Sequence, residues 1–600
     1  MLIKTSDFVV NFLVKKKITH VFGVTGGGAM HLNNSFGTNK SIHFVYTHHE
    51  QSAAMAAESY FREKRNPAIV NVTSGPGGTN AITGVIGAWI DSIPMFIISG
   101  QVPSDQLINK TMTRQIGVQE ADIIKIVKNI TKYSVLVKDS KNIKYEMEKC
   151  YYEMLNGRPG PVWIDIPLDV QSKFINTINL KSYKNKKKKN INLNKKFSKF
   201  FNLIYKSKKP LLILGNGVHI SNAKKEFIKF FKKINFPIIS SWNSSDLINS
   251  NHELYVGRMG IFGDRASNFS AQNCDLMIIL GSRMSIPQIG YLTKEFSKES
   301  KKIIVDIDKF ELNKNLLSNV SLKIKSDLKY FLNQLNIYIK NNNIRIEHNK
   351  FNYWKSIVKE WKIRFPILKE KHKIEKKFVN SFTFIDALSN ACKGNETIVT
   401  DMGTSFTCTM QAFNIKNNLT QRLFTSSGIA AMGFGIPGAI GASFANPKKN
   451  IICLCGDGGM MFNLQEFQTV KHYKLPIKFF IFENKGYLTM KLMQKKNFKK
   501  FVGSSNFSGV SIPNIKKIAN GFGIKYFKIN NDSLVSKINK ILSLKQPVIV
   551  EIQMSEFQAL IPRMQNKLLK DGSFKVAEFD DLYPNISEAE LELERKKTIF

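Results

Sequence analysis

The chain has 600 residues, of which 43% are hydrophobic and 22% are charged, and its formal net charge is +42. Such a length exceeds what one hydrophobic core supports, so about three or four domains are expected, and the composition excludes wholesale disorder. The lysines are spread along every segment and form no arginine-rich stripe interleaved with aromatic residues. A solvated lysine surface is therefore favoured over a nucleic-acid partner.

The cysteines and the hydropathy pattern bear on the compartment. The six cysteines show no zinc-type spacing, and Cys453 and Cys455 fall in an apolar strand, which favours reduced, buried thiols. Residues 1–7 contain no apolar signal core, and no later apolar run approaches membrane-spanning length. We expect a soluble, cytoplasmic protein without a membrane partner.

Residues 1–175 are predicted to form a first α/β domain. Thr5-Ser6-Asp7 is expected to cap the opening helix. Apolar strands then alternate with helices, and each strand runs into a polar or glycine-rich turn. The expected strands span residues 21–24, 42–46, 68–72 and 95–98. Repeated strand-then-helix order predicts a parallel, doubly wound sheet.

A second α/β domain is expected at residues 193–340, after a lysine-rich linker at 176–192. Its Gly215-Asn216-Gly217 turn begins a dinucleotide fingerprint, but Ile220 occupies the third glycine position, so the motif is incomplete. Residues 341–375 are expected to form a helical connection. Its apolar residues recur at helical spacing and are assigned to core packing: Trp354, Ile357, Val358 and Trp361.

Residues 376–560 are predicted to form a third α/β unit, and residues 561–600 a tail or lid. The segment Gly433–Gly438 matches the dinucleotide fingerprint literally. No apolar strand leads directly into it, however, and small residues continue after it. It is therefore read as a tightly packed helix.

Two short turns in this third unit indicate chemistry. Gly456-Asp457-Gly458-Gly459 and Asn484-Lys485-Gly486 each follow an apolar run, and an amphipathic segment lies between them. A strand–helix–strand unit of this length makes the strands parallel neighbours, so Asp457 and Asn484 are expected to converge at one sheet edge. Carboxylate, amide and main-chain oxygens suit magnesium, and the glycines let a phosphate approach the backbone. An ordinary βα turn is the alternative.

With these turns and several further motifs in order, the chain resembles the thiamine diphosphate-dependent enzymes of the acetolactate synthase (acetohydroxyacid synthase) group. The resemblance runs from near residue 5 to about residue 555. It is carried by Val21-Phe22-Gly23, His49-Glu50-Gln51, Thr73–Gly77, Asp91–Pro94, Gly100–Pro103, Arg158–Val162, Met432–Gly435 and Gly456-Asp457-Gly458.

The resemblance implies a fold and an assembly. The fold would be three doubly wound parallel-sheet α/β domains, namely a pyrimidine-binding, a central Rossmann-like and a diphosphate-binding domain. The assembly would be a homodimer or homotetramer with thiamine diphosphate held between subunits. The central domain of the group often binds FAD, and Gly215, Gly217 and the turn 257–260 keep part of that pattern.

The resemblance also implies roles for individual residues. Glu50 would contact the aminopyrimidine ring of the cofactor, where a carboxylic acid can share a proton with the ring nitrogen. The residues implied to line the reacting centre are Gly26, Gly27 and Gln101. Those implied to contact the cofactor are Gly403, Thr404, Met432, Gly456, Gly458, Gly459 and Asn484, and those implied to hold Mg²⁺ are Asp457, Asn484 and the Gly486 carbonyl. Two plainer readings stay open, namely that Glu50 only caps its helix and that Met432 is only core.

Three positions that specify the acceptor in this group have changed. Pro287 stands where the family has an arginine that binds the second substrate's carboxylate, Met493 stands at the family's tryptophan, and Leu168 at its lysine. We therefore expect decarboxylation of a 2-oxo acid, with pyruvate the expected substrate, followed by ligation of the two-carbon unit to an acceptor. Two alternatives are transfer to a keto-sugar nucleotide, as in acetolactate synthase-like proteins of surface-sugar gene clusters, and simple decarboxylation.

Overall fold

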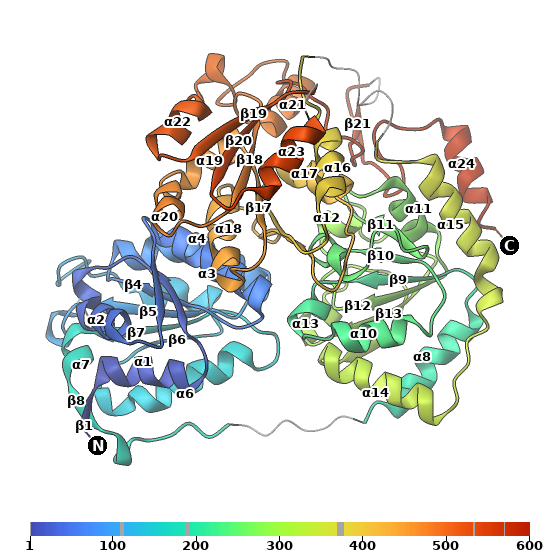
Figure 1. Ribbon diagram of the computed structural model, residues 1–600. Coiled ribbons are helices and arrows are strands. Elements are labelled where there is room, and N and C mark those ends of the chain that lie inside the picture. Colours follow the sequence, from blue (N-terminus) through green and yellow to red (C-terminus); the bar gives the residue numbers. More distant parts are fainter. Residues whose placement is uncertain are drawn as a thin grey trace.

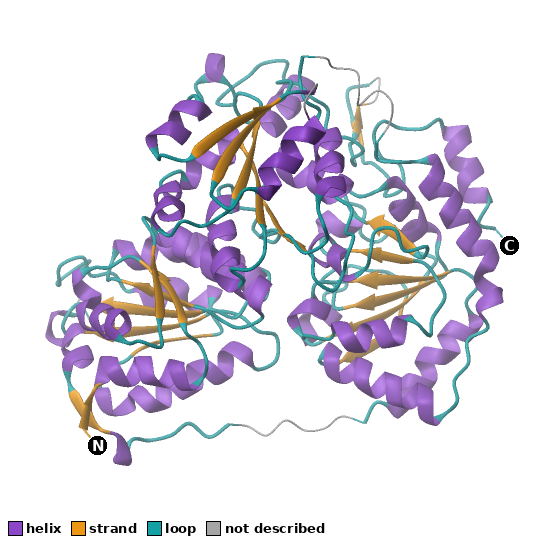
Figure 2. Ribbon diagram, in the orientation of Figure 1, coloured by secondary structure: helices purple, strands orange, loops and turns teal. Residues whose placement is uncertain are grey.

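A computed structural model describes residues 2–108, 113–185, 192–368, 377–531, 534–568 and 571–599 of the chain. Three six-stranded sheets, each made only of parallel strand pairs, form its frame (Figures 1 and 2). Helices flank each sheet (Figure 2). The predicted fold class, three parallel-sheet α/β domains, is confirmed.

The amino-terminal sheet has the strand order β3-β2-β4-β5-β7-β6. Its strands are β2 (His20–Gly23), β3 (His43–Tyr46), β4 (Ile69–Val72), β5 (Phe96–Gln101), β6 (Tyr133–Leu136) and β7 (Val162–Pro167). Its main helices are α1 (Thr5–Lys15), α2 (Met30–Thr38), α3 (Glu50–Lys64), α4 (Pro76–Ile90), α5 (Ile123–Val127), α6 (Ile143–Leu155) and α7 (Leu168–Ser172).

The start of α1 differs from the sequence expectation. The helix already begins at Thr5, the capping position is Lys4, and no side chain makes the cap hydrogen bond. The Thr5 hydroxyl instead donates to the Lys173 carbonyl at 2.8 Å. This bond lies beside the antiparallel pair of β1 (Leu2–Lys4) and β8 (Phe174–Asn176). The Thr5 hydroxyl therefore bonds to a residue far along the chain and does not cap the helix.

The central sheet has the order β11-β10-β9-β12-β13-β14, so the strand order reverses direction between β9 and β12. Its strands are β9 (Pro210–Leu214), β10 (Ile238–Ser240), β11 (Tyr255–Arg258), β12 (Leu276–Leu280), β13 (Lys301–Asp306) and β14 (Val320–Lys325). Its main helices are α8 (Asn194–Lys206), α9 (Gly217–Ile220), α10 (Lys224–Phe231), α11 (Arg265–Asn273), α12 (Ile286–Ile289), α13 (Lys309–Asn313), α14 (Leu328–Asn341) and α15 (Asn352–Arg364).

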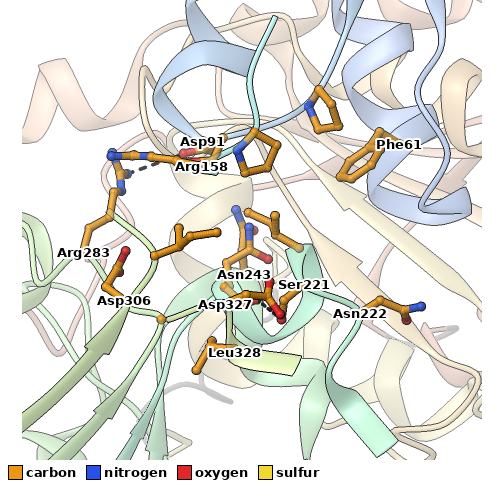
Figure 3. Close-up of a pocket in the computed structure, with 18 of the residues that line it drawn as sticks. Phe61, Asp91, Arg158, Ser221, Asn222, Asn243, Arg283, Asp306, Asp327 and Leu328 are labelled. Carbon is orange, nitrogen blue, oxygen red and sulfur yellow. Dashed lines mark hydrogen bonds and ion pairs between the residues drawn. The ribbon is translucent and has the colours of Figure 1, made fainter. Parts of the chain in front are cut away.

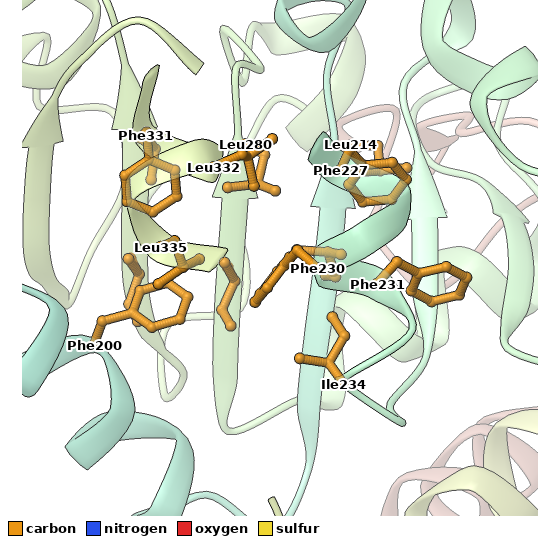
Figure 4. Packing of buried hydrophobic residues seen from close by; sticks show 14 of the residues in the cluster. Phe200, Leu214, Phe227, Phe230, Phe231, Ile234, Leu280, Phe331, Leu332 and Leu335 are labelled. Atoms are coloured by element: carbon orange, nitrogen blue, oxygen red, sulfur yellow. The ribbon is translucent and has the colours of Figure 1, made fainter. Parts of the chain in front are cut away.

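An aromatic layer covers one face of the central sheet. Phe200 of α8, Phe230 of α10 and Phe331 of α14 are fully buried in one cluster with Leu214 and Leu280, the last residues of β9 and β12 (Figure 4). Large rings bury much apolar area, so this layer stabilises the packing of the helices on the sheet. The turns that follow β9 and β12 therefore start from a well-packed edge.

The carboxyl-terminal sheet has the order β16-β15-β17-β18-β20-β19, which repeats the relative order of the amino-terminal sheet. Its strands are β15 (Thr397–Thr400), β16 (Arg422–Phe424), β17 (Ile451–Gly456), β18 (Lys478–Glu483), β19 (Lys525–Ile529) and β20 (Val548–Gln553). Its helices are α16 (Ser381–Ala391), α17 (Thr404–Ala412), α18 (Gly435–Ala445), α19 (Asp457–Met460), α20 (Glu466–His472), α21 (Leu488–Asn497), α22 (Ile515–Gly521) and α23 (Leu534–Ser543).

The first and third sheets are joined through α3 and α18, which lie against each other (Figure 1). A side chain at Gly441 of α18 would overlap the carbonyl oxygen of Ala56 in α3, so only glycine permits this approach. The segment 433–438 thus leads into a tightly packed helix, as predicted.

The carboxyl-terminal segment returns to the central domain. Phe579, Leu582 and Leu591 are buried in the same cluster as Trp354 and Trp361 of α15. Helix α24 (Glu588–Lys596) lies beside α15 (Figure 1), and the Trp361 indole donates to Glu594 at 2.8 Å. The segment therefore acts as a strap that ties the chain end to the central domain.

Residues 186–191 of the predicted linker and residues 369–375 of the predicted helical connection lie outside the described residues. The four predicted packing residues of that connection are all buried. Within the described residues, no helix is long and apolar enough to cross a membrane. All six cysteines are buried and free.

Candidate functional site

The two turns named by the sequence meet at one sheet edge. β17 and β18 pair in parallel, and Asp457 and Asn484 each follow the last residue of their strand. The buried Asp457 carboxylate accepts from the backbone N–H of Gly458 at 2.7 Å, of Asn484 at 2.9 Å and of Gly486 at 3.2 Å. One carboxylate therefore holds both turns together, which confirms the predicted convergence.

The side chain of Asn484 is buried, and its amide oxygen Oδ1 has no hydrogen-bond donor within the described residues. An orphaned acceptor costs free energy unless a ligand satisfies it. Burial is also the main reason that the pKa of Asp457 is raised to about 7. An amide oxygen beside a buried carboxylate is the donor chemistry that a hard divalent cation satisfies, so these residues fit magnesium.

The glycines around this edge do two different things. A Cβ at Gly403 or Gly456 would meet nothing within 4 Å, so the backbone there faces open space. A Cβ at Gly458 would instead lie 2.5 Å from the Tyr487 ring, and one at Gly459 would lie 2.8 Å from Asp401. Gly403 and Gly456 thus leave room for a ligand beside the backbone, whereas Gly458 and Gly459 allow the turn to pack.

Asp401 is a site residue that sequence reasoning did not single out. Its buried carboxylate accepts from the backbone N–H of Met402 at 2.6 Å, of Gly433 at 3.1 Å and of Gly435 at 3.3 Å. It therefore fixes the loop that carries the half-buried Met432. The available signal was an aspartate between the apolar strand 397–400 and Gly403, the same pattern that identified Asp457.

Glu50 is the first residue of α3 and is 8% exposed. The helix is capped by His49, whose ring accepts from the Gln51 N–H at 3.1 Å, so the cap does not need Glu50. The Glu50 carboxylate accepts from the Asn80 amide of α4 at 3.0 Å. Within the described residues, Glu50 and Asp457 share no hydrogen-bond partner.

The other predicted residues of the first domain lie at the carboxyl edge of its sheet. A Cβ at Gly27 would meet nothing within 4 Å, whereas one at Gly26 would lie 2.5 Å from Thr73. The buried Gln101 amide donates to Asp165 at 3.0 Å and to the Ala121 carbonyl at 3.0 Å. Burial raises the pKa of Asp165 to about 7. Gln101 is therefore tied into its own domain by contacts that the sequence did not indicate.

A cavity of about 500 Å³ lies between the amino-terminal and central domains (Figure 3). Its central-domain wall includes Gly217, Gly281 and Asp327, in the turns after β9, β12 and β14, and Asp306 at the end of β13. A Cβ at Gly217 would lie 2.8 Å from the Gly281 Cα, so the turns after β9 and β12 touch where the strand order reverses. This is where open α/β sheets bind ligands. Burial raises the pKa of Asp306 to about 6.

Arginines bridge the two walls of the cavity. Arg158 of the first domain donates to Asp308 at 3.1 Å and to Glu311 at 2.9 Å in the central domain. Arg283 of the central domain lies 3.5 Å from Asp91 of the first, as the dashed line in Figure 3 marks. The cavity is therefore held by ion pairs that cross the domain boundary.

Three family models match the chain in this order. Residues 3–125 match the N-terminal TPP binding domain of thiamine pyrophosphate enzymes, residues 197–335 their central domain, and residues 401–552 their C-terminal TPP binding domain. Among curated proteins, the acetolactate synthase large subunit of Cyanidium caldarium is 31% identical over 92% of this chain and 93% of its own length. The acetolactate synthase large subunit of Lactococcus lactis is 30% identical over 94% of this chain and 95% of its own.

The chain belongs to the thiamine pyrophosphate enzymes of the acetolactate synthase type. A third relative, the acetolactate synthase isozyme 1 large subunit of Escherichia coli, is 30% identical over 93% of the chain and 95% of its own length. The resemblance read from the motifs is confirmed, and the chain is a thiamine pyrophosphate-dependent enzyme of this type.

The three changed positions are built into local structure of this thiamine pyrophosphate enzyme. Pro287 lies in the first turn of α12, where Ser285 and Gln288 form a capping box. Leu168 is the first residue of α7, and Met493 is 41% exposed on α21. Pro287 thus forms part of the start of helix α12, whereas Met493 presents an apolar side chain outward.

Proposed function

We propose that this enzyme uses thiamine diphosphate and Mg²⁺ to decarboxylate a 2-oxo acid, pyruvate, and to pass the two-carbon unit to an acceptor. The observation that carries the proposal is the buried Asn484 amide oxygen, which has no donor among the described residues and lies in a turn held by Asp457. When bound, thiamine diphosphate supplies the electron sink for breaking the bond to the departing carboxylate.

The proposed metal ligands are Asp457, Asn484 and the Gly486 carbonyl. The diphosphate would lie against the open backbone at Gly403 and Gly456, beside Thr404, Gly458 and Gly459. Glu50 would hold a proton at a ring nitrogen of the cofactor, a role that its buried position at the start of α3 supports. Gly26, Gly27 and Gln101 would line the reacting centre, and Met432 would contact the cofactor.

We further propose that the working unit is a homodimer or a pair of such dimers. Glu50 and Asp457 lie in different domains, and each half-site borders open space at a glycine, Gly27 in one and Gly456 in the other. Exposed apolar side chains accompany both halves, on the first domain Met30, Ile116 and Val118, and on the third Met490, Met493 and Phe498. A second copy would cover these side chains and bring one chain's Glu50 to the other's Asp457.

A flavin is a second proposed ligand. The cavity at the reversal point of the central sheet has the place and the carboxylates, Asp306 and Asp327, that a dinucleotide with ribose hydroxyls would use. We propose that FAD binds there. Visible flavin absorbance in the purified protein, or its appearance after dialysis against FAD, tests this, and a colourless protein after dialysis would contradict it.

The acceptor decides between the proposed activities. The relatives are named acetolactate synthases, which supports a 2-oxo acid acceptor, whereas Pro287, Met493 and Leu168 support a different one, such as a keto-sugar nucleotide. The third possibility is release of the aldehyde.

The free cysteines support action in a reducing compartment, the cytoplasm.

One incubation separates these activities. The purified enzyme, thiamine diphosphate, Mg²⁺ and pyruvate are combined with and without a keto-sugar nucleotide, and carbon dioxide and product masses are recorded. Acetolactate, acetaldehyde or a branched sugar identifies the fate of the two-carbon unit. No carbon dioxide from pyruvate or any other short 2-oxo acid would contradict the proposed decarboxylation.

A further inference from the structure

Lys491 is a buried lysine beside the proposed metal site. It lies on α21, is 1% exposed, and its ammonium donates to the main-chain carbonyl of Asn484 at 2.7 Å. The ammonium also lies 3.6 Å from a carboxylate oxygen of Glu556. Burial lowers the pKa of Lys491, with Glu556 and Asp457 acting in the opposite direction. Burying an ammonium group costs free energy unless hydrogen bonds compensate for it, so the bond to the Asn484 carbonyl is expected to matter for the structure of the turn.

Asn484 is held from two sides by these contacts. Its N–H donates to Asp457 at 2.9 Å, and its carbonyl accepts from Lys491 at 2.7 Å. With both main-chain groups engaged, the peptide units on either side of its Cα cannot turn freely. The remaining polar group of the residue is the side-chain amide, whose oxygen has no donor among the described residues.

We propose that Lys491 is a positioning residue that fixes the backbone of Asn484 so that its amide oxygen is presented to the divalent cation. The inference rests on the proposed metal site at Asp457 and Asn484. Since outer contacts of this kind orient metal ligands, their loss weakens metal binding by about 10- to 100-fold.

The same contact ties α21 to the metal turn. Lys491 points inward to Asn484, whereas Met490 and Met493 of the same helix are 40% and 41% exposed. Lys491 therefore sets the position of the helix that presents these two apolar side chains outward. A change at Lys491 is expected to disturb both the cation and that outward surface.

A competing role for Lys491 would have the opposite sign. An ammonium near Asp457 repels a divalent cation, and if repulsion dominated, removing the charge would tighten metal binding. Removing the charge raises the metal dissociation constant if Lys491 positions Asn484, and lowers it if repulsion dominates.

The test measures Mn²⁺ binding to the full-length protein with thiamine diphosphate present, by electron paramagnetic resonance of free Mn²⁺. Lys491→Met is expected to raise the Mn²⁺ dissociation constant by about tenfold or more in protein that remains folded. Lys491→Arg keeps a charged donor and is expected to restore most of the affinity. Lys495→Met is the matched control, because both ammonium groups lie over the Phe557 ring but Lys495 is exposed, and the bond to the Asn484 carbonyl comes from Lys491.

The outcomes are distinct. Unchanged or tighter Mn²⁺ binding by a folded Lys491→Met overturns the positioning role. If that variant does not fold, Lys491→Leu, which also lacks a donor, is judged by the same criterion. Wild-type protein that binds no Mn²⁺ overturns the proposed metal site itself, and the inference falls with it.

Discussion

At the scale of single residues, one buried carboxylate organises the site. Asp457 accepts three backbone N–H groups from two turns, yet burial still raises its pKa to about 7. A carboxyl group binds a cation only when deprotonated, so a proton competes with the metal below this pKa. Both the position and the protonation state of Asp457 therefore determine whether it can bind the proposed cation.

The pH dependence of metal binding follows from this competition. Below about pH 7 the apparent Mg²⁺ affinity is expected to fall about tenfold per pH unit, and above it to level off. Magnesium titrations of thiamine diphosphate binding at several pH values measure this. An affinity that does not change across this range would contradict the assignment of Asp457 as a metal ligand.

Glu50 gives a second prediction at this scale. Glu50→Gln keeps the size of the side chain and a hydrogen-bonding group but cannot exchange a proton, so turnover is expected to drop about 10²- to 10⁴-fold. Thiamine diphosphate binding, measured by calorimetry, is expected to persist. Glu253→Gln, at an exposed position, serves as the control. Wild-type turnover by Glu50→Gln would remove Glu50 from the proposed role.

At the scale of elements, the first and third domains depend on small residues between α3 and α18. Gly441→Val would force its side chain into the Ala56 carbonyl, so we expect a loss of about 2 kcal/mol or more in stability. Gly521→Ala in α22 is the matched control, because a Cβ there meets nothing within 4 Å. Thermal unfolding compares the two variants, and equal melting temperatures would contradict the packing argument.

The sequence predicted the order and pairing of helices and strands better than it predicted contacts between distant residues. The convergence of Asp457 and Asn484 was predictable, because a strand–helix–strand unit dictates parallel neighbours from local pattern alone. The contacts of Asp401 with Gly433 and of Gln101 with Asp165 were not, since they join residues far apart in the chain. For the same reason the Thr5 hydroxyl, expected at a helix cap, pairs with Lys173 instead.

At the scale of the whole molecule, the carboxyl-terminal strap links the chain end to the central domain. Buried Glu594 accepts from the Trp361 indole and pairs with Arg364. Glu594→Ala is expected to loosen residues 577–599 and to speed their removal by a protease at least severalfold. Glu592→Ala, on the exposed face of the same helix, is the control. Equal cleavage of both variants would show that the strap does not depend on Glu594.

We propose above all that Asp457 and Asn484 form a metal-dependent thiamine diphosphate site. Calorimetric titration of the purified protein with thiamine diphosphate, with Mg²⁺ and with a chelator, tests it most directly. We predict saturable binding with Mg²⁺ and a loss of about tenfold or more in affinity with the chelator or in Asp457→Asn. An unchanged thiamine diphosphate affinity with the chelator and in Asp457→Asn, or no binding at all, would contradict the proposal.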